Sequence, residues 1–351
     1  MPLLLALLIL CGYGLLILSS ATGGNSAKLD RQLLHLGLSF FTLLSIAQIP
    51  PRHFYRWAPW FYGGGLFLLI VVLILGEIGK GAQRWLDLGF VRFQPSELLK
   101  LAVPLMLAWF LSRRPLPPKG FRIFWALVLT LVPALLIAKQ PDLGTALLVA
   151  SAGVFVLFLA GLSWRIILSL IATGTALMPV LWHFMRDYQR KRVLTLLDPE
   201  RDPLGAGYHI IQSKIAIGSG GLYGKGLGNG TQSHLEFLPE RSTDFIFAVL
   251  GEELGLFGIL ALLGIYLFII FRGLYMASQI PDAFGRLLAG SLILVFFVYL
   301  FVNMGMVSGL LPVVGVPLPL VSYGGTSMLT LMAGFGILMS LYTHGLANTK
   351  Q

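Results

Sequence analysis

An aspartate at the border between a polar segment and an apolar run is the first candidate for chemistry. Asp244 follows Ser242 and Thr243, either of which could cap a helix, and opens a long apolar run. An acid at a helix N-terminus interacts favourably with the helix dipole, which keeps its carboxylate ionised. A carboxylate held where an apolar helix meets a polar loop is also what a general base acting on a membrane-borne alcohol requires. The residues alone leave both interpretations open, a helix-terminal acid and a catalytic base.

The second candidate is an acid–base pair at the edge of another apolar run. Glu97 and Lys100 follow Pro95 and Ser96, which suit the start of a helix. Their i,i+3 spacing places both side chains on one helix face. A self-neutralising pair that makes a polar helix end tolerable is one interpretation. Ionisable residues inside a membrane usually line a cavity, however, and this favours a functional pair.

Three more basic residues lie in polar segments: Arg84 before a tryptophan, Arg192 in a basic triplet, and Lys225 in a glycine-rich run. The run, residues 218–226, does not match a nucleotide-binding loop. Ser219 stands where that motif needs glycine, and Gly226 stands where it needs Ser or Thr. A loop whose backbone N–H groups and Lys225 bind phosphate remains one interpretation, and a plain flexible turn is the other.

Two other polar features carry structural rather than catalytic expectations. Asp142 is placed to cap a helix that begins at residue 143. His344 and the other histidines show no metal-ligand spacing, and the single cysteine, Cys11, lies in an apolar run. The sequence therefore marks no metal site.

The composition restricts the elements that must position these residues. Of the 351 residues, 56% are hydrophobic and only 11% are charged, whereas a soluble domain carries roughly 25% charged residues. This composition excludes a soluble enzyme, a disordered chain and a collagen-like fibre, and it indicates a protein of the lipid bilayer. Because the apolar stretches are continuous and do not alternate, a porin-type barrel is excluded as well.

Ten apolar runs predict ten transmembrane helices. They lie near residues 2–19, 33–50, 57–77, 96–112, 120–138, 143–162, 165–184, 244–274, 284–309 and 325–343. The first run lacks the basic start of a signal peptide, so we interpret it as the first span. The eighth run contains Glu252 and Glu253, so it is expected to bend or to begin outside the hydrocarbon. The prediction is an all-α polytopic membrane protein, one integral-membrane domain over residues 1–351, with a long loop at about 185–242 between spans 7 and 8.

The charges between the runs predict an orientation. Ten basic residues with a single acid, Asp282, fall on one side of the predicted membrane: Arg52, Arg56, Arg113, Arg114, Lys119, Arg122, Arg165, Arg272, Arg286 and Lys350. Under the positive-inside rule, this side and both termini are cytoplasmic. The other 14 acids fall on or near the opposite, extracytoplasmic side, which therefore holds the candidate chemistry.

Several motifs resemble, in order along the chain, those of the SEDS (shape, elongation, division and sporulation) family of bacterial proteins. They are RW at 84–85, FQPSELLK at 93–100, QPDLGTAL at 140–147, the glycine-rich stretch at 207–232, FLPERSTDFIFAVLGEELG at 237–255 and GLLPVVGVPLPLVSYGGTS at 309–327. Ten spans fit this family. The absence of a long N-terminal extension favours its elongation branch over its division branch.

The resemblance implies a peptidoglycan glycosyltransferase that polymerises lipid II at the outer face of the bacterial cytoplasmic membrane. It also implies a class B penicillin-binding protein and other elongation proteins as partners, and no nucleic acid. The family's essential aspartate corresponds to Asp244, and its Glu/Lys pair falls on Glu97 and Lys100.

These expectations give a mechanistic hypothesis. Asp244 would take a proton from the acceptor hydroxyl. Positive charge would stabilise the leaving diphosphate, and the expected substrate-binding residues are Arg84, Glu97, Lys100, Arg192 and Lys225. A divalent cation, Mg²⁺ or Mn²⁺, would serve similarly, although no ligand cluster marks one.

Two alternatives use the same features differently. A lipid II flippase would also need a polar cavity among many spans, but its charges should be exposed to both leaflets, whereas the acids here gather on one side. A non-catalytic scaffold for a cell-wall synthase would tolerate the loss of Asp244.

Overall fold

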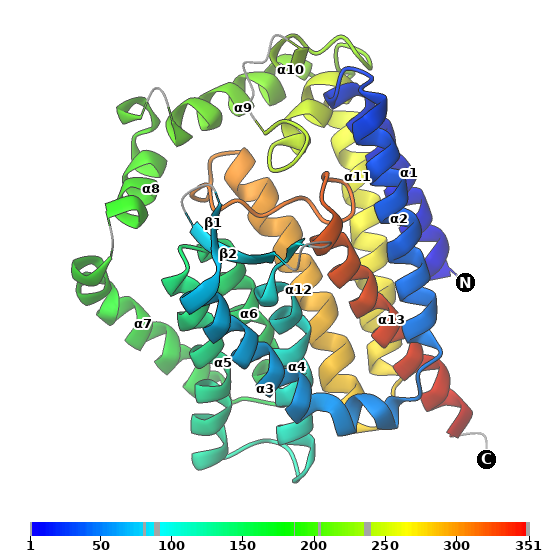
Figure 1. Ribbon diagram of the computed structural model, residues 1–351, viewed down its shortest axis with the longest axis vertical. Coiled ribbons are helices and arrows are strands. Elements are labelled where there is room, and N and C mark those ends of the chain that lie inside the picture. The colour runs from blue at the N-terminus through cyan, green and yellow to red at the C-terminus, as the bar shows by residue number, and fades with distance from the viewer. Residues whose placement is uncertain are drawn as a thin grey trace.

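The computed structural model describes residues 2–79, 82–87, 92–185, 187–202, 205–234 and 240–348, and most of them are helical (Figure 1). The helices before the long loop are α1 (Pro2–Ala21), α2 (Ser26–Ala47), α3 (Pro51–Leu75), α4 (Pro95–Ser112), α5 (Phe121–Lys139), α6 (Leu143–Leu159) and α7 (Trp164–Phe184). The loop contains α8 (Asp187–Leu197), the 3-10 helix η1 (Pro199–Arg201), α9 (Ala206–Gly220) and α10 (Thr231–His234). The last helices are α11 (Ile246–Ser278), α12 (Ala283–Val307) and α13 (Gly325–Asn348).

The ten predicted spans coincide with α1 to α7 and α11 to α13, so the polytopic all-α prediction is confirmed. Seven of these helices are long and apolar enough to cross a membrane by themselves. Helix α6 is shorter than these seven, and the apolar part of α7 covers only Trp164–Pro179. Helix α2 begins with a charged turn containing Lys28, Asp30 and Arg31 ahead of its apolar part. The prediction for α2 started at residue 33 because hydropathy does not detect such a turn.

Helix α12 forms the centre of the bundle. It packs against α4, α6, α11 and α13, and 72% of its most apolar window is buried, against 28% for the peripheral α3. A helix that is apolar on every face must be surrounded by protein or lipid. Two polar side chains interrupt the apolar surface of α12, Ser291 and Asn303, and both are fully buried.

The eighth span is bent, as Glu252 and Glu253 led us to expect. Gly255 interrupts α11 with φ 63° and ψ −158°, a conformation that costs glycine little. At this point the backbone carbonyls of Glu252 and Glu253 accept hydrogen bonds from Lys225 N (3.0 Å) and Gly226 N (2.9 Å). Leu256 N and Phe257 N, which would have bonded those carbonyls in a straight helix, donate to Gly221 and Leu222 instead. The glycine-rich run therefore closes the break in α11.

A small antiparallel sheet is the part of the fold that the sequence did not predict. Its strands are β1 (Glu77–Gly79), β2 (Ala82–Asp87) and β3 (Arg92–Phe93), in the order β1-β2-β3. Glu77 is opposite Trp85, and Leu86 is opposite Phe93. These strands, of two to six residues, are too short for a recognisable period-2 pattern. They occupy the turn between α3 and α4 and position Arg84.

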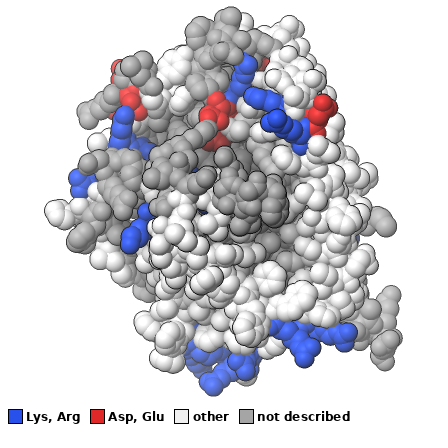
Figure 2. Space-filling view, viewed as in Figure 1, with Lys and Arg blue, Asp and Glu red and all other residues white. Residues whose placement is uncertain are grey.

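The two ends of the bundle differ in charge (Figure 2). We call the end that carries Arg52, Arg113, Arg122, Arg272 and Arg286 the basic end, and the end that carries Arg84, Asp142, Lys225, Glu252 and Asp244 the mixed end. In Figure 1, α9 and α10 lie across the mixed end and α8 stands to one side. Pro2 and His344 line one cavity together with Arg272, so the first and last described helices reach the basic end together. Lys350, which we also expected there, lies outside the described residues.

Candidate active site

Asp244 lies in the turn that leads into α11, and its backbone is fixed by long-range hydrogen bonds. Asn303 Nδ2, on α12, donates to the carbonyl of Asp244 (2.9 Å) and to that of Val316 (2.8 Å). Ser322 Oγ donates to the carbonyl of Thr243, and Tyr323 N donates to the carbonyl of Ser242 (2.8 Å). The turn is therefore held between α12 and the irregular loop 308–324.

The carboxylate of Asp244 faces this loop. A Cβ added to Gly315, which has φ +73°, would lie 3.5 Å from Asp244 Oδ2. The N-cap of α11 is Phe245, with no side-chain cap hydrogen bond. Thr243 Oγ1 instead donates to Glu240 Oε2 (2.9 Å), so neither Ser242 nor Thr243, the two possible caps, is the N-cap of α11. Asp244 therefore precedes the N-cap, and its Oδ2 lies close to Gly315 of the loop.

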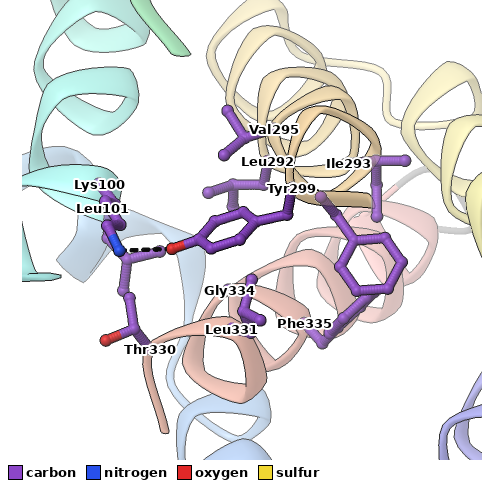
Figure 3. A pocket seen from close by; sticks show the side chains of 11 residues that line it. Lys100, Leu101, Leu292, Ile293, Val295, Tyr299, Thr330, Leu331, Gly334 and Phe335 are labelled. Carbon is purple, nitrogen blue, oxygen red and sulfur yellow. Dashed lines mark hydrogen bonds between the residues drawn. The ribbon is translucent and has the colours of Figure 1, made fainter. Parts of the chain in front are cut away.

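Glu97 and Lys100 form a buried ion pair on α4. Lys100 Nζ lies 2.6 Å from Glu97 Oε1, and the two residues are 5% and 6% exposed. Lys100 Nζ also donates to the hydroxyl of Tyr299 on α12 (Figure 3). The other carboxylate oxygen, Glu97 Oε2, is buried and has no hydrogen-bond partner in the described part of the chain. A buried carboxylate oxygen without a donor is costly, so it points to a donor from water or substrate.

Helix α12 connects this pair to the turn of Asp244. Tyr299 contacts Lys100, and Asn303 contacts the carbonyl of Asp244. The two α12 residues are four apart, so they share one face about 6 Å apart along the axis. Tyr299 is a site residue that our sequence analysis missed. The available signal was two polar side chains at i,i+4 within the apolar run 284–309.

A small cavity lies beside Lys100 and Tyr299, between α4, α12 and α13 (Figure 3). Its volume is about 30 Å³ and most of its lining is apolar, including Leu292, Leu331 and Phe335. This volume accommodates a water molecule but no sugar. The cavity therefore does not serve as the substrate site, and the polar groups that face the mixed end are the candidates for contact with substrate.

Arg84 binds the turn between α5 and α6. Its guanidinium donates to the carbonyls of Gln140 and Pro141 and lies 3.9 Å from Asp142 Oδ2. Asp142 caps α6 as predicted, accepting from Thr145 N (3.1 Å), and also accepts from Gln94 Nε2 (3.0 Å). Since Gln94 is the N-cap of α4, Arg84 lies over the end of the helix that carries Glu97 and Lys100.

Lys225 is bound to α11. Its Nζ lies 2.8 Å from Glu252 Oε1 and 2.8 Å from Thr231 Oγ1. Glu252, which is fully buried, also accepts from Thr231 Oγ1 and Gln232 N (both 3.0 Å). Because the backbone N–H groups of Lys225 and Gly226 bond to α11, they are not available to a phosphate while the kink keeps this form. The glycine-rich run is therefore an ordered segment bonded to α11 rather than a plain flexible turn.

The structure brings together only some of the predicted site residues. Arg84, Glu97 and Lys100 lie near the start of α4, and Asp244 is joined to them through α12. Lys225 lies at the kink of α11, and Arg192 lies on α8, which packs against η1 and α9. In the described residues no group of three or more His, Cys, Asp or Glu side chains gathers to bind a metal.

The chain is similar to known proteins along nearly its whole length. The family model of cell cycle proteins of the FtsW, RodA and SpoVE type matches residues 1–346. The chain is 59% identical over 342 residues to the peptidoglycan glycosyltransferase MrdB of Escherichia coli K12, covering 97% of this chain and 92% of that protein.

Two solved structures have the same fold. One is a chain in a peptidoglycan synthase complex that coordinates polymerization and crosslinking, with a TM-score of 0.86, 34% identity, and coverage of 98% of this chain and 97% of that one. The other is the rod shape determining protein RodA of Thermus thermophilus, with a TM-score of 0.74, 30% identity, and coverage of 97% and 96%. The resemblance to the SEDS proteins is thereby confirmed, and the chain belongs to the FtsW/RodA/SpoVE family of cell cycle proteins.

Proposed function

We propose that this chain is a peptidoglycan glycosyltransferase that polymerises lipid II into glycan strands and releases undecaprenyl diphosphate. The observation that carries the proposal is the fixed position of Asp244, whose carboxylate faces the loop 308–324 at the mixed end, one helical turn of α12 away from the Tyr299–Lys100 contact. The curated relative named as a peptidoglycan glycosyltransferase supports it.

The reaction that fits this site is an inverting displacement at the anomeric carbon of the donor sugar. The 4-hydroxyl of the acceptor attacks that carbon, and its proton passes to the carboxylate of Asp244. A new glycosidic C–O bond forms as the bond to the diphosphate oxygen breaks, and the bonding electrons leave with undecaprenyl diphosphate. The activated donor supplies the free energy.

The basic residues of the mixed end stabilise the negative charge of the leaving group. The side chains of Arg84 and Lys225 are 30% and 28% exposed, so each keeps part of its surface open to the solvent at the mixed end. Lys100 is buried against Glu97 and Tyr299, so its part is to fix the geometry of the site through that pair. Arg192 supplies positive charge from α8.

A divalent cation, Mg²⁺ or Mn²⁺, fits this chemistry as a ligand of the diphosphate. Such ions are commonly held by substrate phosphates and one or two carboxylates, so they need no larger group of protein ligands. The cation would neutralise charge on the leaving group. Removing it with EDTA is expected to slow polymerisation, and adding Mg²⁺ or Mn²⁺ back should restore the rate.

The location and the partners of the protein follow from the same proposal. The protein is placed in the bacterial cytoplasmic membrane with both termini in the cytoplasm and the mixed end outside, where lipid II is polymerised. Its partners are the growing strand, a class B penicillin-binding protein that crosslinks it, and other elongation proteins. The similar chain found in a complex for polymerization and crosslinking supports this pairing.

The deciding experiment compares the wild-type protein with Asp244→Asn, which keeps the shape of the side chain and removes the base. Purified protein, with and without a class B penicillin-binding protein whose transpeptidase is blocked, is incubated with labelled lipid II. The wild type is expected to form long glycan strands, and the variant is expected to lose at least 100-fold in rate.

The matched control is Asp30→Asn, which removes the same charge from an exposed residue at the mixed end. It should polymerise at the wild-type rate. Wild-type polymerisation by Asp244→Asn would exclude Asp244 as the base.

A further inference from the structure

A cavity at the basic end combines arginine and aromatic side chains. It lies between the end of α4 and the start of α5 and has a volume of about 540 Å³. Its lining consists of Phe110, Arg113, Arg114, Phe121, Arg122 and Trp125. The candidate active site uses none of these residues and lies at the opposite end of α4.

The positive charge of this cavity is not neutralised by the protein. In the part of the chain that the structure describes, no carboxylate pairs with Arg113, Arg114 or Arg122. Arg113 and Arg114 are exposed, and Lys119 adds a further exposed charge in the same loop. Several cations in one concave surface create a local potential that attracts anions.

The three arginines have different local roles. Arg122 donates to the carbonyls of Leu111 (2.6 Å) and Pro115 (2.9 Å), so it fixes the loop that follows α4. The guanidinium of Arg113 lies 4.7 Å from the ring centre of Trp109. A stacked guanidinium keeps its in-plane N–H groups for an anion. Arg114 makes no side-chain hydrogen bond in the described residues, so its donors are available too.

The aromatic side of the cavity points to a lipid rather than to a soluble anion. Phe121 and Trp125 are 73% and 42% exposed and contact each other edge to face, with ring centres 5.8 Å apart. Aromatic residues at the end of a span lie at the level of the headgroups. The outward face of α5 continues with exposed Phe124, Val132 and Leu135, which offer an apolar path for acyl chains.

We propose that this cavity binds the headgroup of an anionic glycerophospholipid from the surrounding leaflet. The phosphate contacts the guanidinium groups of Arg113 and Arg114, and the acyl chains lie along the outward face of α5. Basic pockets between transmembrane helices are known to suit anionic headgroups. The inference rests on the cavity alone and is independent of the proposed polymerase activity.

The test measures lipid binding to the full-length protein by native mass spectrometry after purification in a non-ionic detergent. Dioleoyl phosphatidylglycerol is titrated against dioleoyl phosphatidylcholine, which has the same chains and a zwitterionic headgroup. The wild type is expected to bind phosphatidylglycerol at least tenfold more tightly, and Arg113→Gln/Arg114→Gln is expected to lose this preference. Arg114→Gln alone, which disturbs no hydrogen bond, should lose several-fold in affinity.

The matched control is Arg52→Gln/Arg56→Gln, which removes two exposed arginines from the same end but outside the cavity. It should keep the wild-type preference. Equal losses in both double variants would show general charge attraction and overturn the site, as would wild-type affinity in Arg113→Gln/Arg114→Gln. Displacement of phosphatidylglycerol by millimolar inorganic phosphate would assign the cavity to a small soluble anion instead of a lipid.

Discussion

At the scale of single residues, the site depends on polar groups buried among apolar helices. Glu97 and Lys100 neutralise each other, Lys100 also donates to the hydroxyl of Tyr299, and the amide of Asn303 donates to two carbonyls. Buried polar groups of this kind favour one arrangement of the helices, because each alternative packing would leave a donor or acceptor unsatisfied.

Substitutions of the buried pair Glu97 and Lys100 can separate an effect on stability from an effect on activity. Lys100→Met leaves the carboxylate of Glu97 buried without its cation, which is expected to cost about 3–5 kcal/mol. Glu97→Gln/Lys100→Met removes both charges and should recover most of that loss in thermal unfolding in detergent. If the pair positions the site as proposed, the double variant polymerises lipid II more slowly than the wild type even though its stability has recovered. Wild-type activity in the double variant would reduce the pair to a structural role.

At the scale of elements, the kink of α11 contacts both the glycine-rich run and the end of α1, and so joins three parts of the mixed end. Lys225 of the glycine-rich run bonds to Glu252, and Ser20 at the end of α1 donates to Glu253 Oε1 (2.6 Å) while accepting from Gly228 N (3.0 Å). The first half of α11, which follows Asp244, is therefore fixed by contacts on both sides.

Gly255→Ala is expected to weaken this arrangement. An added Cβ would lie 2.4 Å from Gly224 N and 2.7 Å from Leu222 O, and the positive φ disfavours any L side chain. We expect a loss of more than 1 kcal/mol in stability, seen as a lower melting temperature, together with reduced polymerisation. Gly264→Ala in the same helix is the control, because a Cβ there meets nothing within 4 Å and should be neutral or stabilising.

The packing of α9 on the turn before α11 introduces a dependence on pH. His209 lies 5.7 Å, ring centre to ring centre, from Phe245. Burial lowers the pKa of His209 below its ordinary value of 6.5, although Glu240 and Asp202 act in the opposite direction. The fold thus favours the neutral ring, and the unfolded chain takes up more protons just below pH 6.5. Stability should decrease as the pH falls from about 7 towards 5, and it should decrease less in His209→Gln. The same decrease in melting temperature for both proteins over that pH range would contradict this assignment.

At the scale of the whole molecule, the separation of charge between the two ends is the main feature. The basic end suits the cytoplasmic surface of a bacterial membrane, and the mixed end suits the outer surface, where the proposed reaction takes place. The helices that carry the site start or end at the mixed end, so one orientation accounts for both the charge pattern and the chemistry.

Cysteine labelling tests this orientation. The single cysteine, Cys11, is buried, so Cys11→Ala gives a background for single substitutions. Ser219 and Ser278 are a matched pair, because both end a helix and bond back to a carbonyl three residues earlier, at the mixed end and the basic end respectively. In intact cells, a membrane-impermeant maleimide should label Ser219→Cys and spare Ser278→Cys. The reverse pattern would invert the proposed topology.

Hydropathy and charge are local properties, so the sequence alone determined the membrane class, the ten spans and the asymmetry of charge. Asp142 as a cap and the bend near Glu252 and Glu253 were also predictable, since each depends on residues a few positions away. The prediction of Asp244, Glu97 and Lys100 as site residues stays untested until their variants are assayed.

Only the tertiary structure decided which groups meet. Lys100 and Tyr299 are 199 residues apart, and Asp244 and Asn303 are 59 apart, so no local pattern could pair them. The same holds for the glycine-rich run, which looked like a phosphate loop or a flexible turn and proved to close the break in α11. Chain folding sets these contacts because a buried polar group must find its partner wherever the packing of apolar helices brings one within reach.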